Sequence, residues 1–179
     1  MKISETGIKG LLVLEPRVFK DARGYFFESY HREILRKHGI EHEFIQDNQS
    51  RSSHGVIRGL HYQKEPHAQA KLVRVTEGAI FDVAVDLRRD SPSYGKWYGL
   101  ELSADNFLQL LIPKGFAHGF SVLSDHATLY YKCDGYYHPE SESGIRFDDP
   151  DLGIDWKIDP GRAIISDKDR SLPYMKQIK

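Results

Sequence analysis

The sequence predicts an all-β sandwich or barrel, and three observations support this fold class. Short apolar runs recur at intervals of roughly ten residues along most of the chain. Turn signals such as Ser91-Pro92-Ser93 and Ala104-Asp105-Asn106 separate these runs. Only one segment shows a clear helical pattern.

The expected elements follow in chain order. The run at 11–14 is closed by Pro16, and the aromatic run at 25–30 reads as a strand. The helix spans about residues 32–38 and ends at Gly39. The strands expected after it cover residues 44–48, 56–62, 72–75, 81–87, 108–112, 116–122 and 127–132.

Alternation is clearest at 81–87, where Phe81, Val83 and Val85 share one face and Asp82, Ala84 and Asp86 the other. From Gly144 onward the chain is richer in Asp, Pro and Gly, so loops are expected to wrap the barrel there.

Length and composition limit the function classes. The chain of 179 residues fits one domain over 1–179, and its formal net charge of −1 gives no basic excess for nucleic acid. The single cysteine, Cys133, cannot form an intrachain disulfide. The N-terminus lacks the apolar core of a signal peptide, and no apolar run is long enough to cross a membrane. A cytoplasmic protein is therefore expected.

The most informative stretch is Arg58-Gly59-Leu60-His61-Tyr62-Gln63, together with Lys71. It places a base, an anion-binding arginine and a fixed positive charge on neighbouring strands. Such a set suits proton removal next to a carbonyl in a phosphorylated substrate. It does not suit a metal, because no second histidine stands two residues from His61.

Two segments look like the two halves of the cupin pattern, a double-stranded β-helix or jelly-roll barrel. The first runs from Gly59 to Gly78 and the second from Ile112 to Phe120. Metal-binding cupins carry His-x-His in the first half, whereas this chain has only His61 there. A cupin without metal, with one or a few short helices, is the expected fold.

Longer strings resemble the dTDP-4-dehydrorhamnose 3,5-epimerase family, in family order and over nearly the whole chain. The departure is Ala70, where the family pattern has Gly before the lysine. The matching strings lie at 21–28, 46–48, 58–63, 71–75, 81–88, 112–120, 131–132, 136–137 and 166–170.

This resemblance implies a dTDP-linked 4-keto-6-deoxy sugar as substrate, epimerised at C3 and C5 without a cofactor. Loss of either hydrogen next to the C4 ketone gives an enolate, and protonation from the other face inverts the centre. His61 would be the base, Asp169 its partner, Lys71 the charge facing the oxyanion, and Tyr131 the acid.

The resemblance also implies the binding residues and a homodimer with exchanged N-terminal strands. Arg23 and Arg58 suit the diphosphate, since guanidinium groups make paired bonds to it. Tyr137 would stack on thymine. The remaining members of the nucleotide or sugar site would be Glu28, Gln46, Asn48, His118, Glu142 and Lys168, with Phe26 and Phe120 as apolar wall.

Each residue also has a structural reading. Cys133 reads as a small core residue, the Arg88-Arg89-Asp90 stretch as a solvated turn, and seven histidines as surface groups: His31, His38, His42, His54, His67, His126 and His138. Three other functions stay open. They are an epimerase that inverts only C3 or only C5, a cupin binding module without turnover, and a metal-dependent cupin.

Overall fold

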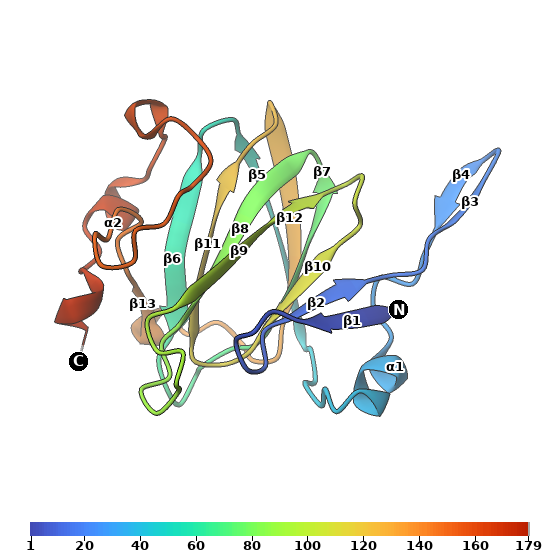
Figure 1. Ribbon diagram of the computed structural model, residues 1–179, viewed down its shortest axis with the longest axis horizontal. Coiled ribbons are helices and arrows are strands. Elements are labelled where there is room, and N and C mark those ends of the chain that lie inside the picture. The colour runs from blue at the N-terminus through green and yellow to red at the C-terminus, as the bar shows by residue number, and fades with distance from the viewer. Residues whose placement is uncertain (179) are drawn as a thin grey trace.

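The computed structural model describes residues 1–178, and two antiparallel sheets face each other in it (Figure 1). The first has six strands, in the order β1 (Lys2–Glu5), β2 (Leu12–Glu15), β10 (Gln109–Ile112), β7 (Lys71–Glu77), β12 (His126–Cys133) and β5 (Gln46–Ser53). The second has five, in the order β13 (Glu142–Gly144), β6 (Ile57–Gln63), β11 (Phe116–Val122), β8 (Ala79–Asp86) and β9 (Trp97–Ser103). The predicted all-β class is confirmed.

The helical content is small, as predicted. The helix α1 (Arg32–Lys37) begins where the His31 side chain accepts from the Ile34 amide. The other helical turns are η1 (Pro139–Ser141), η2 (Pro160–Arg162), α2 (Asp167–Arg170) and η3 (Met175–Gln177). Within the described part of the chain, none of the helices has the length and apolarity that a membrane span requires.

Apolar side chains from both sheets fill the space between them. β7 supplies Val73 and Val75, β8 supplies Ile80, and β12 supplies Leu129, all buried in one cluster. Burial of such side chains is the main stabilising contribution to a fold of this kind. The same interior also contains polar side chains, which form the site described below.

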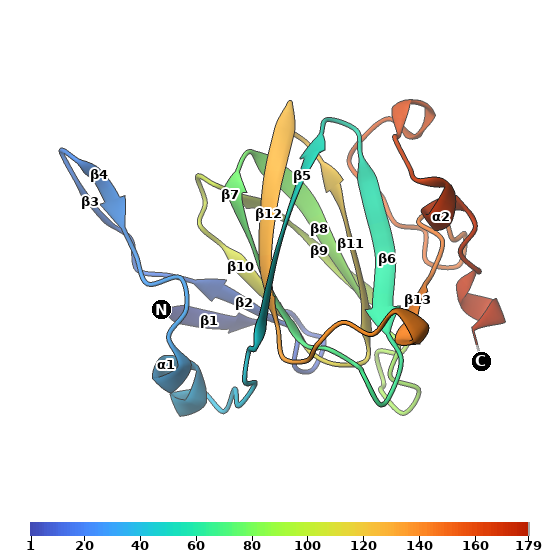
Figure 2. The ribbon, with the colours of Figure 1, turned by 180° about the vertical axis from the view of Figure 1, so that it is seen from behind.

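The C-terminal segment covers the outer face of the five-stranded sheet (Figure 2). Leu152 and Trp156 from this segment pack with Phe81, Val83 and Val85 of β8. The alternation read from the sequence is therefore correct, but both faces of β8 are buried. The second face is buried because the C-terminal loops wrap over it, as the sequence predicts.

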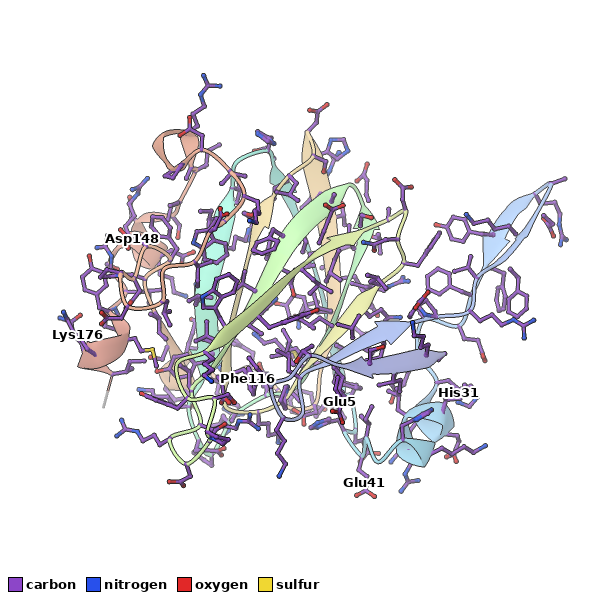
Figure 3. The ribbon with its side chains drawn as sticks, in the orientation of Figure 1. Glu5, His31, Glu41, Phe116, Asp148 and Lys176 are labelled. Carbon is purple, nitrogen blue, oxygen red and sulfur yellow. The ribbon has the colours of Figure 1, made fainter. Side chains whose placement is uncertain are left out.

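A hairpin of β3 (Phe19–Asp21) and β4 (Gly24–Phe26) projects from the two sheets (Figure 1). Its side chains stand out from the body of the molecule (Figure 3), apart from contacts such as that of Tyr25 with Phe107. Tyr25 and Phe26 are 58% and 66% exposed there. The expected strand at 25–30 thus ends at Phe26 and joins neither large sheet. Exposed aromatic side chains on a projecting hairpin are typical of a surface that another molecule covers.

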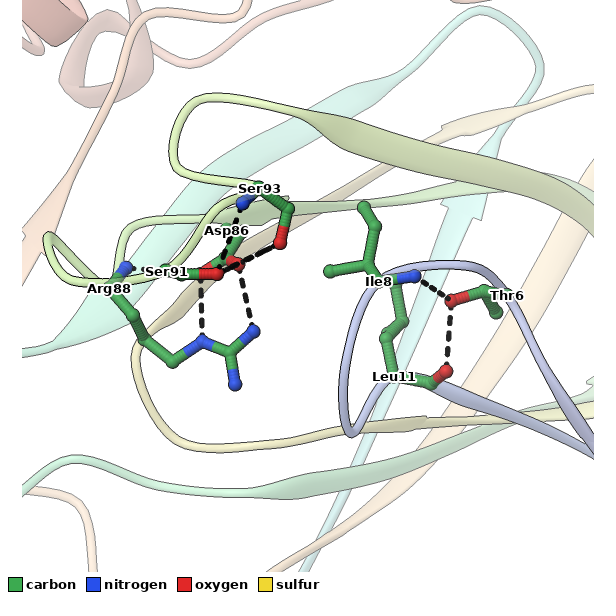
Figure 4. A network of polar contacts seen from close by, with 7 residues as sticks. All are labelled: Thr6, Ile8, Leu11, Asp86, Arg88, Ser91 and Ser93. Carbon is green, nitrogen blue, oxygen red and sulfur yellow. Dashed lines mark hydrogen bonds and ion pairs between the residues drawn. The ribbon is translucent and has the colours of Figure 1, made fainter.

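The turn after β8 is held by a buried carboxylate (Figure 4). Asp86 accepts two hydrogen bonds of 2.8 Å from the Arg88 guanidinium, and one each from Ser91 and Ser93. These bonds bring the pKa of Asp86 to about 2 even though burial acts to raise it. The expected solvated turn is found at Arg89 and Asp90, which are exposed, whereas Arg88 is only 30% exposed and its charge neutralises this carboxylate.

Candidate active site

Three of the four predicted catalytic residues come from the two sheets and meet between them. His61 is on β6 and stands opposite His118 of β11. Lys71 is on β7, and Tyr131 is on β12 opposite Asn48. Two cavities, of about 280 and about 150 Å³, share His61, Lys71 and Tyr131 in their walls. The base and the acid expected from the sequence therefore face one space from opposing sheets.

His61 is oriented by Asp169. Its Nε2 atom lies 2.7 Å from Oδ1 of Asp169, and the two side chains are 30% and 5% exposed. The other carboxylate oxygen accepts from the Gly59 amide at 3.1 Å. Burial acts to raise the pKa of Asp169, but the bonds from His61 and Gly59 outweigh it and lower the pKa. Asp169 is thus an ionised partner for the imidazole.

Short local structure brings Asp169 to this place. Ser166 caps the four-residue helix α2 by accepting from the Asp169 amide. On the β6 side, glycines allow a close approach of strands, since a Cβ at Gly59 would lie 2.5 Å from Gly119 Cα. The Gly-Leu-His spacing of the sequence therefore has a packing reason as well as a chemical one.

A second histidine–aspartate pair is buried beside the first. His118 Nε2 lies 2.8 Å from Oδ1 of Asp82 on β8, and the side chains are 7% and 0% exposed. Asp82 Oδ2 has no hydrogen-bond partner among the described residues. The alternation of the sequence placed Asp82 on the strand face opposite Phe81 but gave it no role. Its partnership with His118 depends on the pairing of β8 with β11, which the sequence does not state.

Burial shifts the pKa values of both Lys71 and Tyr131. Burial lowers the pKa of Lys71, while the nearby acidic groups of Asp82 and Glu142 oppose that shift. Burial also raises the pKa of Tyr131. Lys71 Nζ lies 5.8 Å from the centre of the Tyr131 ring. Tyr131 therefore keeps its proton at neutral pH, next to a cation that can stabilise a developing oxyanion.

Polar groups expected at the nucleotide or sugar site line the larger cavity. Gln46 and Asn48 of β5 are joined by a 3.1 Å hydrogen bond. Tyr137 donates to Glu142 at 2.7 Å, and Glu142 in turn pairs with Lys168 at 2.6 Å. The structure therefore brings four of these predicted residues into the wall of the larger cavity and holds Lys168 against one of them, Glu142.

The smaller cavity contains three more of the predicted residues, Arg58, His118 and Phe120. Arg58 Nε donates to Ser52 Oγ at 3.0 Å, and this bond holds the guanidinium against the end of β5. Phe120 is 5% exposed and belongs to the inner apolar cluster.

Three predicted residues in the segment around the β3–β4 hairpin lie away from both cavities, which corrects their assignment within a single chain. Arg23 is at the tip of the β3–β4 hairpin and pairs with Asp21 at 2.6 Å. Phe26 is exposed on the same hairpin, and Glu28 lines a separate hollow with Met1 and Arg17. The hairpin projects away from the sheets (Figure 1), so Arg23 and Phe26 do not line the His61 cavities of their own chain.

Sequence reasoning missed some residues that line the larger cavity. Gln63 and Gln69 flank the loop between β6 and β7, and Tyr62 lies beside them. Cys133 is buried, as predicted, yet its side chain is also in the cavity wall. Their side-chain types give no signal of a site, although all stand within three residues of one that was identified.

A family model described as dTDP-4-dehydrorhamnose 3,5-epimerase matches residues 5–177. The chain belongs to this family. A dTDP-4-dehydrorhamnose 3,5-epimerase of Escherichia coli is 54% identical over 173 residues, covering 96% of this chain and 93% of the relative. Curated relatives with this degree of identity establish the family from end to end.

Solved structures of the epimerase family agree with the fold. The Bacillus anthracis enzyme with TDP and PPi bound is 51% identical, with a TM-score of 0.94, covering 97% of this chain and 99% of that one. The Legionella pneumophila enzyme, in complex with dTDP-4-keto-L-rhamnose, is 47% identical with a TM-score of 0.95, covering 99% and 94%. A 3'-monoepimerase from Streptomyces bikiniensis is more distant, at 34% identity and a TM-score of 0.88, covering 95% and 86%. The predicted cupin barrel is confirmed.

Proposed function

We propose that this chain converts dTDP-4-dehydro-6-deoxy-D-glucose to dTDP-4-dehydro-L-rhamnose, by inverting C3 and C5. One observation carries the mechanism: the His61–Asp169 pair faces Lys71 and Tyr131 across the space between two sheets. A flat enolate held there has a base on one side and an acid on the other.

Proton removal belongs to His61. Its Nε2 atom is engaged by Asp169, which leaves Nδ1 to accept the proton from the carbon next to the ketone. The ionised Asp169 then stabilises the imidazolium that forms. This is the orienting role that a carboxylate plays toward a catalytic histidine in other enzymes.

The enolate and its second protonation belong to Lys71 and Tyr131. The Lys71 ammonium provides positive charge where the C4 oxygen becomes negative, in a space shielded from water. Tyr131 gives its proton to the opposite face of the carbon. Because burial raises the pKa of Tyr131, it stays protonated until the strongly basic enolate takes the proton.

The dTDP portion binds at the rims of the two cavities. Arg58 is suited to the diphosphate, since guanidinium groups make paired charge-assisted bonds to phosphate. Tyr137 is half exposed at the mouth of the larger cavity and offers a ring for thymine. The bound dTDP-sugar and TDP in the two related enzymes support this class of ligand for the chain.

The active form is a homodimer in which the β3–β4 hairpin enters the partner's site. The hairpin carries Arg23 and Phe26, both predicted site residues, away from the cavities of their own chain. A symmetric exchange of two hairpins would bury these exposed aromatic rings and complete both sites. The assignments of Arg23, Phe26 and Glu28 depend on this dimer.

Residues 1–179 act as one catalytic domain, because the family match spans residues 5–177 and both sheets supply the site. The cytoplasmic location expected from the sequence stays a prediction. Inversion of one centre only is the second candidate. The 3,5-epimerases of E. coli, B. anthracis and L. pneumophila are 47–54% identical to this chain, against 34% for the 3'-monoepimerase, which favours inversion at both centres.

The identity of the product tests this function. The purified chain is incubated with dTDP-4-dehydro-6-deoxy-D-glucose, a 4-reductase and NADPH, and the reduced sugar is analysed by proton NMR. We expect the L-rhamno configuration. A sugar inverted at C3 alone or C5 alone would identify a monoepimerase. Unchanged substrate after prolonged incubation would favour a binding module.

A further inference from the structure

Two loops next to the active site bring two histidines and a glutamate together. His67 lies between β6 and β7, while His138 and Glu140 lie between β12 and β13. The two imidazole rings are stacked, with centres 3.6 Å apart and planes at 19°. His138 Nδ1 lies 3.2 Å from Glu140 Oε1. Sequence analysis assigned both histidines to the surface separately, and the proposed epimerisation gives them no role.

The backbone around these residues is fixed by its own hydrogen bonds. Gln63 donates to the His138 carbonyl at 2.8 Å and accepts from the His138 amide at 2.9 Å. Gln69 donates to the Gly135 carbonyl at 2.7 Å. The Ala70 amide donates to Asp134 at 2.7 Å. The two loops are therefore held in place before any ligand arrives, which reduces the entropy that binding costs.

The donor atoms of the three side chains converge. One ligand atom from each of His67, His138 and Glu140 lies within 4.8 Å of the other two. A tetrahedral zinc ion with bonds of about 2.0–2.1 Å holds its ligands about 3.4 Å apart. Binding of one ion would therefore require the two rings, which are only partly buried, to rotate from their stacked arrangement. The exposed side of the cluster leaves room for a water as fourth ligand.

We propose that His67, His138 and Glu140 bind one divalent transition-metal ion, and that zinc is the ion they suit best. Two imidazoles and one carboxylate form a donor set for zinc and its neighbours, whereas calcium and magnesium prefer oxygen ligands alone.

The ion would connect two loops that both reach the active site. Gln69 from the first loop, Gln63 at the end of β6 and Tyr137 from the second loop line the larger cavity. A metal bridge between His67 and His138 would therefore hold Tyr137 against the first loop. The ion stays outside the His61–Tyr131 chemistry, so its role is to stabilise the cavity wall.

The test is zinc binding to the full chain without a histidine tag, stripped with a chelator and exchanged into metal-free buffer at pH 7.5. Isothermal titration against ZnCl₂ should give one ion per chain with micromolar Kd. The same ion should raise the thermal unfolding midpoint. His67→Asn and His138→Asn should each weaken binding by at least about tenfold, the lower end of the effect of losing a group around a metal. Glu140→Gln should weaken it as well while keeping both rings.

His126→Asn is the matched control. His126 pairs with Glu77 at 2.8 Å, and no second imidazole lies in that pair, so zinc affinity should not change. Two results would overturn the proposal: no saturable binding by the wild-type chain, or binding that survives in the His67→Asn, His138→Asn double variant. Glu140 is exposed, so Glu140→Gln should fold normally and can replace a histidine variant that fails to fold as the test of metal binding. All readouts are binding or unfolding, so their outcome is independent of epimerase turnover.

Discussion

His61 Nε2 lies 2.7 Å from Oδ1 of Asp169, a residue 108 positions further along the chain. The first comes from a strand of the five-stranded sheet, the second from a four-residue helix in the C-terminal segment. The Gly59 amide holds the other carboxylate oxygen at 3.1 Å. The C-terminal segment therefore does more than cover the sheet, since it orients the proposed base.

Asp169→Asn should lower kcat by at least about 10²-fold, the low end for loss of general acid–base catalysis. The amide keeps the size of the side chain but removes the charge that stabilises the imidazolium. His61→Asn should cost at least as much, because it removes the base. Steady-state rates of the two variants at pH 7.5 measure this. Turnover of Asp169→Asn within a few-fold of wild type would show that the pair is structural.

Lys71→Met should lower kcat by about 10²–10³-fold, as loss of an oxyanion-stabilising group does. Methionine preserves much of the side-chain volume while removing the charge. Lys132→Met is the control, because Lys132 pairs with Asp47 at 2.8 Å and lines neither of the two cavities. Its turnover should stay close to wild type. Equal losses in both variants would indicate a general effect on the β7–β12 pairing.

Two inactive variants should complement each other if the β3–β4 hairpin enters a partner's site. Arg23→Ala lacks a group on the hairpin, and His61→Asn lacks the base in the cavity. A mixed dimer has one site with both intact residues. After unfolding and refolding an equimolar mixture, activity should recover to about a quarter of wild type. No recovery, or a fully active monomer by sedimentation, would contradict the exchanged dimer.

Asp86→Asn should destabilise the fold in a pH-dependent way. The pKa of Asp86 is lowered from 3.8 to about 2, so its ionised form stabilises the native state above pH 3.8. At pH 7 this amounts to about 2 kcal/mol, and it is lost as the pH falls from about 4 to 2. Urea unfolding at pH 7 and pH 2.5 should show a difference between wild type and variant that shrinks with acid.

Asp148→Asn is the comparison for that measurement. Asp148 pairs with Arg146 at 2.7 Å, but its side chain is 39% exposed. An exposed ion pair contributes at most about 1 kcal/mol. A loss at Asp148 as large as at Asp86 would contradict the role given to burial.

The order of strands along the chain was largely predictable, but their arrangement was not. Alternation identified β8 and the apolar run at 116–122 matched β11 in full. β9 was missed because its mixed sequence is only partly buried at the edge of the sheet. The burial of both faces of β8 depends on Trp156, and no local pattern connects residues so far apart.

In the site, too, residues in local motifs could be predicted, whereas contacts that depend on strand arrangement could not. His61 and Lys71 were identifiable because both lie in short motifs whose residue types suit proton transfer. The place of Asp82 beside His118 was not, since it depends on strand register. The separation of Arg23 from the cavities was not predictable either, because an apolar strand in a core and one at a subunit contact have the same composition.

The division of roles between His61 and Tyr131 is tested most directly by deuterium exchange in Tyr131→Phe. In deuterated water, NMR follows deuterium at C3 and C5 of the substrate together with formation of epimerised product. The intact His61 should still remove a proton and return deuterium to the same face, so exchange should persist while inversion falls much further. His61→Asn should lose both together. Equal loss of exchange and inversion in Tyr131→Phe would contradict an acid that acts only after the base.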